Sequence, residues 1–329
     1  MATHTDKPIA ILGAGAWGTA LALYLSRRGQ AVYLWSIETP QVEMMQRERT
    51  NNQYLPGYPF PETLHPETEL ATALTQAEDI LLAVPSVGFR EVLLKLKPLL
   101  TPAHRFLSAT KGMDMETGQL LHQTFDELIG SRYPYAVISG PSFAKEVAAG
   151  LPTAVVIASR NQKLAEEFSK RFNSPLFRID LSEDIIGVEI GGVVKNVLAI
   201  AAGISDGMKL GANARSTLIT RGLNEMITLG KALSADNKTF EGLSGLGDLI
   251  LTCTDDLSRN RRFGLALGQN MPKEQAEREI GQVVEGKRNA ELLIQLAHRY
   301  SIKMKICEAV HYILQGKALA KEAMQDILA

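Results

Sequence analysis

The sequence predicts an α/β domain with a mainly parallel sheet, followed by an all-α domain. In the first half of the chain, short β-branched runs alternate with helical patterns, which is typical of βαβ units. From about residue 182 onward, nearly every segment has a helical pattern or is a short loop. The length of 329 residues also favours two domains over one.

The individual elements follow from hydrophobic pattern and turn residues. The expected buried strands are residues 7–13, 31–35, 79–84, 105–110, 136–140, 153–159 and 175–180. The expected helices between them are residues 17–28, 40–49, 86–97, 117–129, 142–149 and 161–172. Ser182, followed by Glu183 and Asp184, is a good helix start. We therefore expect residues 1–182 to form the first domain and residues 183–329 the second.

Composition argues against several classes of function. Thirty-five Lys and Arg balance thirty-six Asp and Glu, and no basic stripe suggests nucleic acid as a partner. Cys253 and Cys307 are far apart, which favours a reducing cytoplasm over a disulfide framework, and the six histidines lack metal-ligand spacing. Residues 1–8 are polar rather than a secretory signal. Because the histidines lack ligand spacing, we expect no metal. The apolar stretches 9–25 and 185–204 are interrupted, so we also expect no membrane insertion.

The first chemical signal is the run GAGAWG. Gly13, Gly15 and Gly18 fit the pattern G-x-G-x-x-G between a strand and a helix, where backbone amides can meet a pyrophosphate. This context favours dinucleotide binding by a Rossmann-like domain over a simple glycine-rich turn. At the end of the second strand, Ser36 and Ile37 are neither the acid usual for NAD nor the base usual for NADP. The choice of cofactor stays open.

Loops that follow parallel strands should meet at one crevice, because ligands bind beyond the carboxyl ends of the strands. Three such loops are residues 83–86, 109–112 and 139–142. Lys111 is the charged residue among them, although a solvated loop lysine is the simpler interpretation by itself. Gly140 and Ser142 stand at a helix start, where free amides favour an anionic or polar ligand and where Ser142 could also be an N-cap.

A second cluster lies in LSGLGDLILTCTDDLSRNRRFG, residues 243–264. If GDLILT is helical, Asp248 and Thr252 share a face, and a carboxylate among leucines usually has a partner. Ser258, Arg259 and Asn260 are donors that suit a small oxyanion. A solvated basic turn explains the same residues equally well.

Lys195 and Asn196 interrupt the apolar segment GVEIGGVVKNVLAIAAGIS, residues 187–205. The lysine could reach water past small residues, and Glu189 suggests that one face is solvated. The alternative is that Lys195 faces a pocket near the domain boundary, where the glycines at 191 and 192 admit another group. Partial desolvation would then lower its pKa and make it a proton donor and acceptor near neutral pH.

At this point the chain shows a family resemblance. It is similar to the NAD(P)-dependent glycerol-3-phosphate dehydrogenases, in particular the bacterial soluble type, in the runs GAGAWGTALA, LAVPS, SATKG, ISGPSFAKEV, VVKNVLAIAAGI, GLGDLILTCT, SRNRRFG and GQVVEG, which occur in this order from about residue 8 to 310. The resemblance implies interconversion of dihydroxyacetone phosphate and sn-glycerol 3-phosphate, which supplies phospholipid synthesis, and it implies a homodimer.

The resemblance also implies roles for single residues. Lys195 matches the proton donor or acceptor, and Lys111, Asp248 and Thr252 complete the catalytic group. Substrate contacts are implied for these two lysines and Asp248, and for Gly140, Ser142, Ser258, Arg259 and Asn260. Dinucleotide contacts are implied for Gly13, Gly15, Ala16, Trp17, Gly18, Lys111, Ala144, Arg259, Val283 and Glu285. The chain departs from the family at Ile37, where a His or Arg that favours the 2′-phosphate is common.

The combined hypothesis is hydride transfer from a reduced nicotinamide to the C2 carbonyl, with Lys195 protonating the oxygen while Asp248 holds its ammonium. Arg259 and Asn260 then grip the phosphate. Two alternatives stay open. A β-hydroxyacid dehydrogenase would act on a carboxylate instead, and a dinucleotide-sensing protein would have no need of Lys195, Asp248 and Arg259 together.

Overall fold

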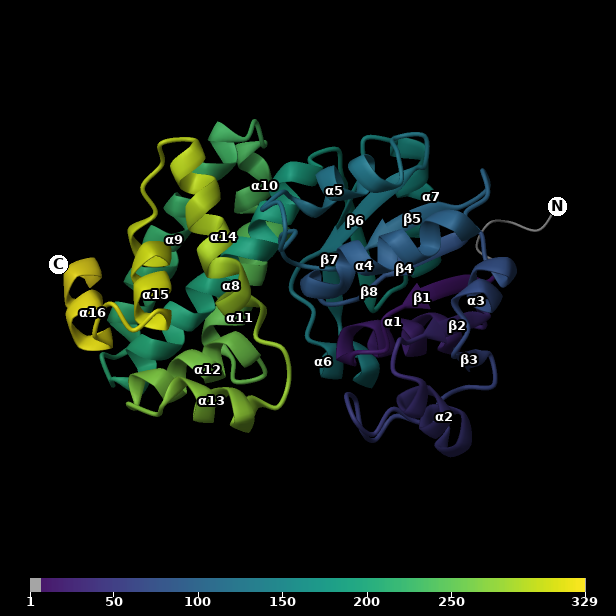
Figure 1. The fold of residues 1–329 in the computed structure, drawn as a ribbon, viewed down its shortest axis with the longest axis horizontal. Coiled ribbons are helices and arrows are strands. Elements are labelled where there is room, and N and C mark those ends of the chain that lie inside the picture. Colours follow the sequence, from purple (N-terminus) through teal and green to yellow (C-terminus); the bar gives the residue numbers. More distant parts are fainter. Residues whose placement is uncertain (1–6, 329) are drawn as a thin grey trace. The chain divides into compact units, whose positions relative to one another are not determined.

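The computed structural model describes residues 7–328, and in it the chain forms two compact units (Figure 1). Of the described residues, the first unit contains those up to Thr110 and then Leu121–Ile185; the second contains Lys111–Leu120 and those from Ile186 onward. The segment Lys111–Leu120 therefore belongs to the helical unit, although it lies in the first half of the sequence. Most of the polar start, residues 1–6, lies outside the described residues, so the prediction made from residues 1–8 is not addressed by the structure.

The first unit is an eight-stranded sheet with the strand order β3-β2-β1-β4-β5-β6-β7-β8. Every neighbouring pair is parallel except β6 and β7. This arrangement confirms the predicted fold class. The strands are β1 (Ile9–Leu12), β2 (Val32–Trp35), β3 (Leu64–Glu67), β4 (Asp79–Leu82), β5 (Arg105–Ser108), β6 (Tyr135–Ser139), β7 (Thr153–Ala158) and β8 (Phe177–Ser182).

Helices accompany the sheet, as the alternating pattern predicts. They are α1 (Ala16–Arg27), α2 (Thr39–Glu48), α3 (Leu70–Gln76), α4 (Ser86–Leu96), the short 3-10 turn η2 (Lys97–Leu99), α5 (Leu121–Leu128), α6 (Ala144–Ala149) and α7 (Gln162–Phe172). Strand order reverses between β1 and β4, which pair side by side although β2 and β3 come between them in the chain. In open parallel sheets this switch point is where nucleotides bind, beyond the carboxyl ends of the strands.

The strand β3 and the helix α3 were not among the predicted elements. The strand has the sequence LHPE, which lacks the β-branched run that signals a buried strand. Its Pro66 is tolerated because β3 is the edge strand, where one row of backbone groups needs no partner. The prediction of a helix over residues 117–129 was also too long, because α5 begins only at Leu121.

The second unit consists of helices in the part of the chain described. They are α8 (Ile185–Gly207), α9 (Ala212–Ala232), α10 (Asn237–Glu241), the π-helical turn η3 (Leu243–Gly247), α11 (Asp248–Thr254), α12 (Arg259–Gly268), α13 (Lys273–Ile280), α14 (Glu285–Arg299), α15 (Lys305–Leu314) and α16 (Ala320–Leu328). By length and hydropathy α8 resembles a membrane span, yet 94% of its apolar window is buried inside the unit. It is the core helix around which the others pack.

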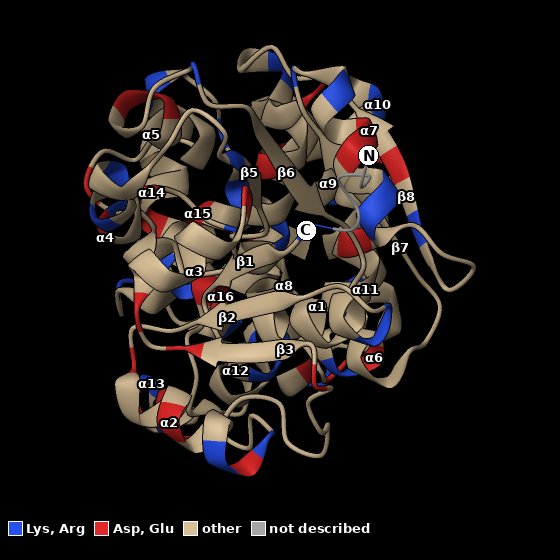
Figure 2. Cartoon of the chain, turned by 90° about the vertical axis from the view of Figure 1, so that its right-hand side faces the viewer, with Lys and Arg blue, Asp and Glu red and all other residues tan. Residues whose placement is uncertain are grey.

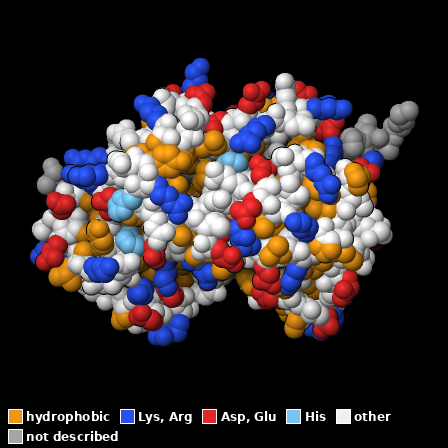
Figure 3. Space-filling view, turned by 45° about the horizontal axis from the view of Figure 1, so that its top comes forward, with side chains coloured by type: hydrophobic (Ala, Val, Ile, Leu, Met, Phe, Trp, Pro, Cys, Tyr) orange, Lys and Arg blue, Asp and Glu red, His pale blue; other side chains and the backbone are white. Residues whose placement is uncertain are grey.

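Charged side chains of both signs are interspersed on the surface. In Figure 2, helices such as α2 and α7 each carry blue and red residues, in keeping with the net charge of −1. The face drawn in Figure 3 likewise mixes basic and acidic side chains with small hydrophobic areas. No continuous basic area is visible on this face.

Candidate active site

A buried ion cluster lies in the second unit, around one carboxylate. Lys195 of α8 is 7% exposed and Asp248, the first residue of α11, is 1% exposed. The Lys195 ammonium donates to Asp248 Oδ1 at 2.5 Å and to Thr252 Oγ1 at 3.0 Å. Thr252 lies one turn after Asp248 and donates its own hydroxyl proton to the Asp248 carbonyl at 2.6 Å. Asp248 and Thr252 therefore share a face of α11, as predicted, and both accept hydrogen bonds from Lys195.

Lys111 joins this cluster from the segment that crosses into the helical unit. Its ammonium lies 2.7 Å from Asp248 Oδ2, so one carboxylate carries two lysines. Burial lowers the pKa of Lys195 to about 7; Asp248 opposes this shift and the positive charge of Lys111 adds to it. Burial alone would raise the pKa of Asp248, but the two ammonium groups outweigh it and lower that pKa. The cluster therefore holds an ionised acid beside an amine that can titrate near neutral pH.

The interpretation of Lys195 as a lysine that reaches water past small residues was wrong. Lys195 and Asn196 are both buried, and Glu189, which suggested a solvated face, is only 6% exposed. The glycine before this pair has a packing role: a Cβ on Gly191 would lie 2.3 Å from the carbonyl oxygen of Ser244 in the π-helical turn. That turn leads directly into Asp248, so α8 and the carboxylate are held at close range.

Asn196 continues the same polar interior on the adjacent face of α8. Its Oδ1 accepts from Asn260 Nδ2 at 2.9 Å, and its own Nδ2 donates to the Gly192 carbonyl at 3.0 Å. Asn260 Oδ1 in turn accepts from the backbone of Gly286 at 2.9 Å. The amide in the apolar helix therefore joins α8 to the start of α12 and to the start of α14. Asn196 was not among the predicted site residues.

The predicted donor cluster begins α12, and its members differ in what they already bind. Ser258 is the N-cap and accepts from the Arg261 backbone at 3.2 Å. Arg259 donates from Nη1 to Gln282 Oε1 at 3.1 Å, and burial lowers the pKa of its guanidinium while Glu285 opposes that shift. Arg259, Val283 and Glu285 thus belong to one region, formed by α12 and the loop before α14.

Two glycine pairs set the distance between α8 and α12. A Cβ on Gly203 would meet the Arg261 carbonyl oxygen at 2.1 Å, and one on Gly264 would meet the Ile200 carbonyl oxygen at 2.1 Å. Gly207 and Gly268 repeat this contact one turn later, with 2.3 Å in both cases. Such backbone contact is possible only without side chains, so it fixes the helix that carries Arg259 against the helix that carries Lys195.

The glycine turn of the first unit joins β1 to α1. Gly13 has φ +116°, a conformation that disfavours side chains, and a Cβ there would lie 2.6 Å from the Ala83 carbonyl oxygen. A Cβ on Gly18 would lie 2.0 Å from the Gly13 carbonyl oxygen. Beside Gly15, by contrast, the space is open. The turn is tight where it packs on the sheet and accessible where a ligand would approach.

The start of α1 suits a pyrophosphate. Its N-cap, Gly15, has no side chain to occupy the first amides, and the first turn contains no acidic residue. Ala16 and Trp17 open the helix, and the buried indole Nε1–H of Trp17 finds no partner among the described residues. An open helix start with an unused donor beside it fits a dinucleotide.

Two further residues hold this turn and were not predicted. The Ala14 carbonyl, inside the glycine motif, accepts from Gln41 Nε2 at 2.7 Å and from Asn51 Nδ2 at 2.8 Å. Gln41 also accepts from Ser36 Oγ at 2.7 Å, so the Ser36 hydroxyl orients the amide that binds the glycine turn. Ile37 beside it is 54% exposed. Neither position offers a charge for recognising the ribose of NAD or the phosphate of NADP.

The remaining predicted residues lie beyond β6 in the first unit. Gly140 has φ +146°, and a Cβ there would meet Val155 Cα at 2.9 Å. Ser142 donates to the Gly140 carbonyl at 2.9 Å, and the N-cap of α6 is Phe143, so the alternative that Ser142 is an N-cap was wrong. Ala144 is the first residue of α6. These three residues and the glycine turn belong to one unit, and the lysine cluster with Arg259 belongs to the other.

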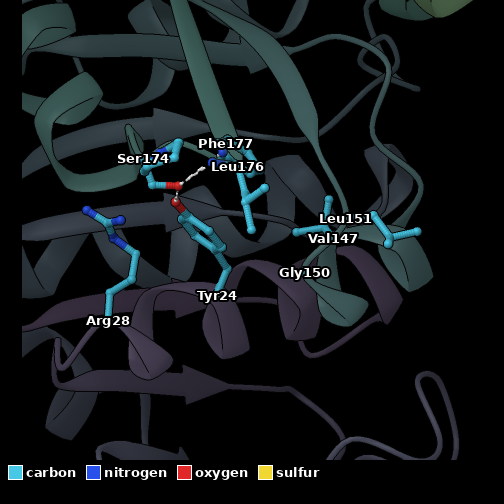
Figure 4. A pocket seen from close by; sticks show the side chains of 9 residues that line it. Tyr24, Arg28, Val147, Gly150, Leu151, Ser174, Leu176 and Phe177 are labelled. Atoms are coloured by element: carbon cyan, nitrogen blue, oxygen red, sulfur yellow. Dashed lines mark hydrogen bonds between the residues drawn. The ribbon is translucent and has the colours of Figure 1, made fainter.

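A separate pocket in the first unit is lined by none of these residues (Figure 4). Its volume of about 230 Å³ is below the roughly 300–1,000 Å³ of typical ligand sites. The hydroxyl of Tyr24 at its wall donates to the Phe172 carbonyl at 2.5 Å and lies 2.9 Å from Ser174 Oγ. We assign no ligand to this pocket.

Among residues 7–328, no group of three or more His, Cys, Asp and Glu side chains is placed to hold a metal ion.

A nucleotide-type turn at the switch point of a parallel sheet, together with a helical unit that buries a titratable lysine, defines the class of dinucleotide-dependent dehydrogenases. Comparison with known families is specific. Residues 8–165 match the model of the NAD-dependent glycerol-3-phosphate dehydrogenase N-terminus, and residues 184–325 match that of the C-terminus. The chain belongs to this family.

Individual relatives agree over the whole length. A glycerol-3-phosphate dehydrogenase, NAD(P)+, of Haemophilus ducreyi is 51% identical over 329 residues, which is 100% of this chain and 98% of the relative. The protein of the same name from Pasteurella multocida is 52% identical, with 99% and 97% covered. The crystal structure of glycerol-3-phosphate dehydrogenase from Coxiella burnetii superposes with a TM-score of 0.96 at 50% identity, covering 98% of this chain and 99% of that one.

Proposed function

We propose that the protein reversibly reduces dihydroxyacetone phosphate to sn-glycerol 3-phosphate with NADH or NADPH. Family membership supports the reaction, since relatives about 50% identical over the whole chain carry this dehydrogenase name. The observation that carries the proposal for this chain is the buried Lys195–Asp248 pair, in which burial lowers the pKa of the lysine to about 7. A group that titrates near the working pH is suited to both giving and taking the proton.

Lys195 is the proposed acid. When bound, the reduced nicotinamide supplies a hydride to the C2 carbonyl carbon. Lys195 gives a proton to the carbonyl oxygen, so no alkoxide has to persist in a buried site. An ammonium has three N–H donors; Lys195 directs one at Asp248 and one at Thr252, which leaves the third for the substrate oxygen. In the reverse direction the neutral amine accepts the proton of the alcohol.

The substrate phosphate is the proposed ligand of Arg259. Its guanidinium uses one N–H toward Gln282 and has further donors in the same plane. Asn260 adds to this site through its remaining amide proton, while Ser258 contributes by capping the helix. Gly140 and Ser142 are proposed for the same substrate. Contacts with the remote phosphate position the reacting carbon, which lowers the entropic part of the barrier.

The cofactor contacts proposed from the family resemblance are Gly13, Gly15, Ala16, Trp17, Gly18, Lys111, Ala144, Arg259, Val283 and Glu285. We further propose that residues 1–182 act as the dinucleotide-binding domain and residues 183–329 as the substrate and catalytic domain. A cytoplasmic homodimer that supplies glycerol 3-phosphate to phospholipid synthesis completes the proposal. The two cysteines, which are both free and buried, are compatible with a reducing compartment.

An initial-rate assay with dihydroxyacetone phosphate, run in parallel with NADH and NADPH, tests the reaction. Lys195→Ala should lower kcat by about 10²-fold or more while dinucleotide affinity is nearly unchanged. Lys231→Ala, an exposed lysine of α9, is the matched control and should keep the wild-type kcat. An unchanged kcat in Lys195→Ala would remove this residue from the chemistry. Turnover of ketones that carry a carboxylate instead of a phosphate, or binding without any turnover, would contradict the proposed reaction.

A further inference from the structure

We propose that Asn289 is a positioning residue that places Lys111 in the active-site cluster and holds Glu285 at the same time. The inference rests on the proposed function. Asn289 touches neither Lys195 nor Asp248 in the contacts described, and neither the sequence motifs nor the family resemblance assigned it a role. It acts through the two segments that its side chain joins.

Both ends of the Asn289 amide are used. The residue lies on α14 and is 0% exposed. Its Oδ1 accepts from the backbone of Met113 at 2.9 Å. Its Nδ2 donates to the Glu285 carbonyl at 2.8 Å and lies 3.4 Å from Glu285 Oε2. A buried amide with donors and an acceptor matched in this way resists rotation, because a flip would oppose donor to donor.

The segment that Asn289 holds is a compact loop. Asp114 accepts from the backbones of Glu116 and Thr117 through Oδ1, both at 2.9 Å, and its own backbone donates to the Gln119 carbonyl at 2.9 Å. A bridge between Met113 and Leu120 closes the loop. Because these bonds are internal, they give the loop a shape but do not place it on the helices.

Directed contacts place the loop on the helices. Besides the ion pair of Lys111 with Asp248, they include the Met113–Asn289 bond and the bond from Arg299 Nη2 to the Thr117 carbonyl at 3.4 Å, which is long and exposed. Met113 also buries its side chain in the core of the helical unit, with 0% exposed. Since hydrophobic contact is not directional, the fully buried bond from the Met113 backbone to Asn289 fixes the register of the loop next to Lys111. Lys111 lies only two positions before Met113.

The placement of Lys111 has an electrostatic consequence for Lys195. The two ammonium groups share Asp248, and the charge of Lys111 contributes to the lowered pKa of Lys195. If the loop shifts and Lys111 withdraws, the full charge of Asp248 acts on Lys195 and its pKa should rise. Loss of Asn289 should therefore change the pH dependence of turnover in the same direction as loss of Lys111 itself.

The second contact of the Asn289 side chain is with Glu285. Glu285 opens α14, and its carboxylate opposes the lowering of the Arg259 pKa. Glu285 is also a proposed cofactor contact. Asn289 therefore connects the loop of Lys111 with the residue proposed to touch the dinucleotide, so its loss should raise the KM for the dinucleotide in addition to lowering kcat.

The experiment compares Asn289→Leu, which keeps the branching and the number of heavy atoms of the side chain and removes both polar contacts, with Lys111→Met and with the double variant. Displacing a catalytic group by about 1 Å can cost up to 10²-fold, so Asn289→Leu should lower kcat by about 10- to 100-fold. The apparent pKa in the kcat profile for reduction should move upward. In the Lys111→Met background, Asn289→Leu should cause no further shift of that pKa, because both changes remove the same interaction.

Leu293→Ala is the matched control, since Leu293 is buried on the same helix and packs in the core. It should lower stability toward urea while the apparent pKa stays at the wild-type value. An unchanged pH profile in Asn289→Leu, an equal shift in Leu293→Ala, or a shift that adds to that of Lys111→Met would each overturn the role of Asn289. A wild-type enzyme that does not reduce dihydroxyacetone phosphate would overturn the proposed function instead, so the two failures are distinguishable.

Discussion

Asp248 cannot fully neutralise two ammonium groups, and this imbalance is the main electrostatic property of the site. Lys111 and Lys195 each bind one of its oxygens, at 2.7 and 2.5 Å. Releasing one proton from the cluster leaves one cation and one anion, which is the cheaper state in a buried site. Of the two lysines, Lys195 is the more deeply buried, with 8% of its side chain exposed against 19% for Lys111. Burial lowers the pKa of Lys195, so this lysine can release a proton near neutral pH.

The pH dependence of turnover follows from this assignment. Reduction needs the protonated form of Lys195, so kcat for dihydroxyacetone phosphate should fall as pH rises through about 7. Oxidation of glycerol 3-phosphate needs the neutral amine, so its kcat should rise through the same range. Initial rates in both directions between pH 5.5 and 9, roughly two units on either side of the midpoint, check the prediction. Profiles that move in the same direction would contradict it.

Arg259 should act on binding rather than on the chemical step. We expect Arg259→Ala to raise the KM for dihydroxyacetone phosphate by about 10- to 100-fold, since hydrogen bonds to charged groups contribute roughly 1.5–3 kcal/mol. Arg262→Ala, an exposed arginine of the same helix, serves as the control with an unchanged KM. Steady-state kinetics with substrate varied at saturating dinucleotide measures both. A normal KM in Arg259→Ala would exclude the residue from the phosphate site.

Two charged residues of the proposed site stand out in the sequence, whereas most of the amides around it do not. A lysine inside an apolar helix or an aspartate among leucines is costly unless paired, so Lys195 and Asp248 are informative by themselves. Gln41, Asn51 and Asn289 carry no such signal, because an amide is equally compatible with a solvated surface. Asn196 does interrupt an apolar segment, but its sequence position does not tell which partners it has. The partners of these amides are backbone groups or other amides that only the fold brings close.

Among the elements, α8 and α12 pack with their backbones in contact, which is possible only because glycines lie where the two helices meet. The four glycines that line their contact are spaced four residues apart on each helix, at 203 and 207 and at 264 and 268. Because glycine in a helix interior costs about 1 kcal/mol relative to alanine, each helix is intrinsically weaker than it could be. The close approach of the two backbones offsets this cost and brings the start of α12 toward Asn196.

Gly264→Ala tests this contact. The added methyl would lie 2.1 Å from the Ile200 carbonyl oxygen, so the helices must move apart. We expect a loss of about 1–3 kcal/mol in the free energy of unfolding, measured in urea, with a raised KM for the phosphorylated substrate. Gly88→Ala on α4 is the matched control, since the space beside Gly88 is open, and it should be neutral or stabilising. Equal stability of the two variants would show that the close contact is unimportant.

At the level of elements, prediction succeeded where burial imposed a pattern and failed where it did not. The strands β1 and β4 are buried along their whole length and appear in the sequence as apolar runs. The edge strand β3 needs no such run, and its Pro66 made a strand still harder to predict from the sequence. The helix α5 was extended too far at its start, since residues 117–120, with the weak helix formers Thr117 and Gly118, belong to the loop, in which Asp114 accepts from the backbones of Glu116 and Thr117.

At the level of the whole molecule, the helical unit is assembled from two separate stretches of chain. The segment Lys111–Leu120 leaves the first unit after β5, contributes Lys111 and Met113 to the helices, and returns at α5. A boundary near residue 182 describes the sequence pattern but leaves this segment on the other side. No local pattern in the sequence predicts this assignment, because it depends on long-range contacts such as those of Lys111 with Asp248 and of Met113 with Asn289.

A fragment of residues 183–329 should therefore be less stable than the helical unit of the intact chain. Without the segment, Asp248 keeps one lysine and the acceptor of Asn289 loses its donor. We expect backbone amides of α11 and the start of α14 to exchange with deuterium faster in the fragment than in the full chain, as measured by mass spectrometry. Equal protection of these amides in both would contradict this expectation.

The exchange of chain between the units also bears on recombination among homologues. A chimaera that joins the nucleotide-binding half of one parent to the helices of another at residue 182 would import the foreign loop with its lysine. Crossovers should succeed more often when residues 111–120 and the helices descend from the same parent. Natural hybrids of this fold would then show a mosaic pattern in which this short insert shares its ancestry with the carboxyl-terminal half.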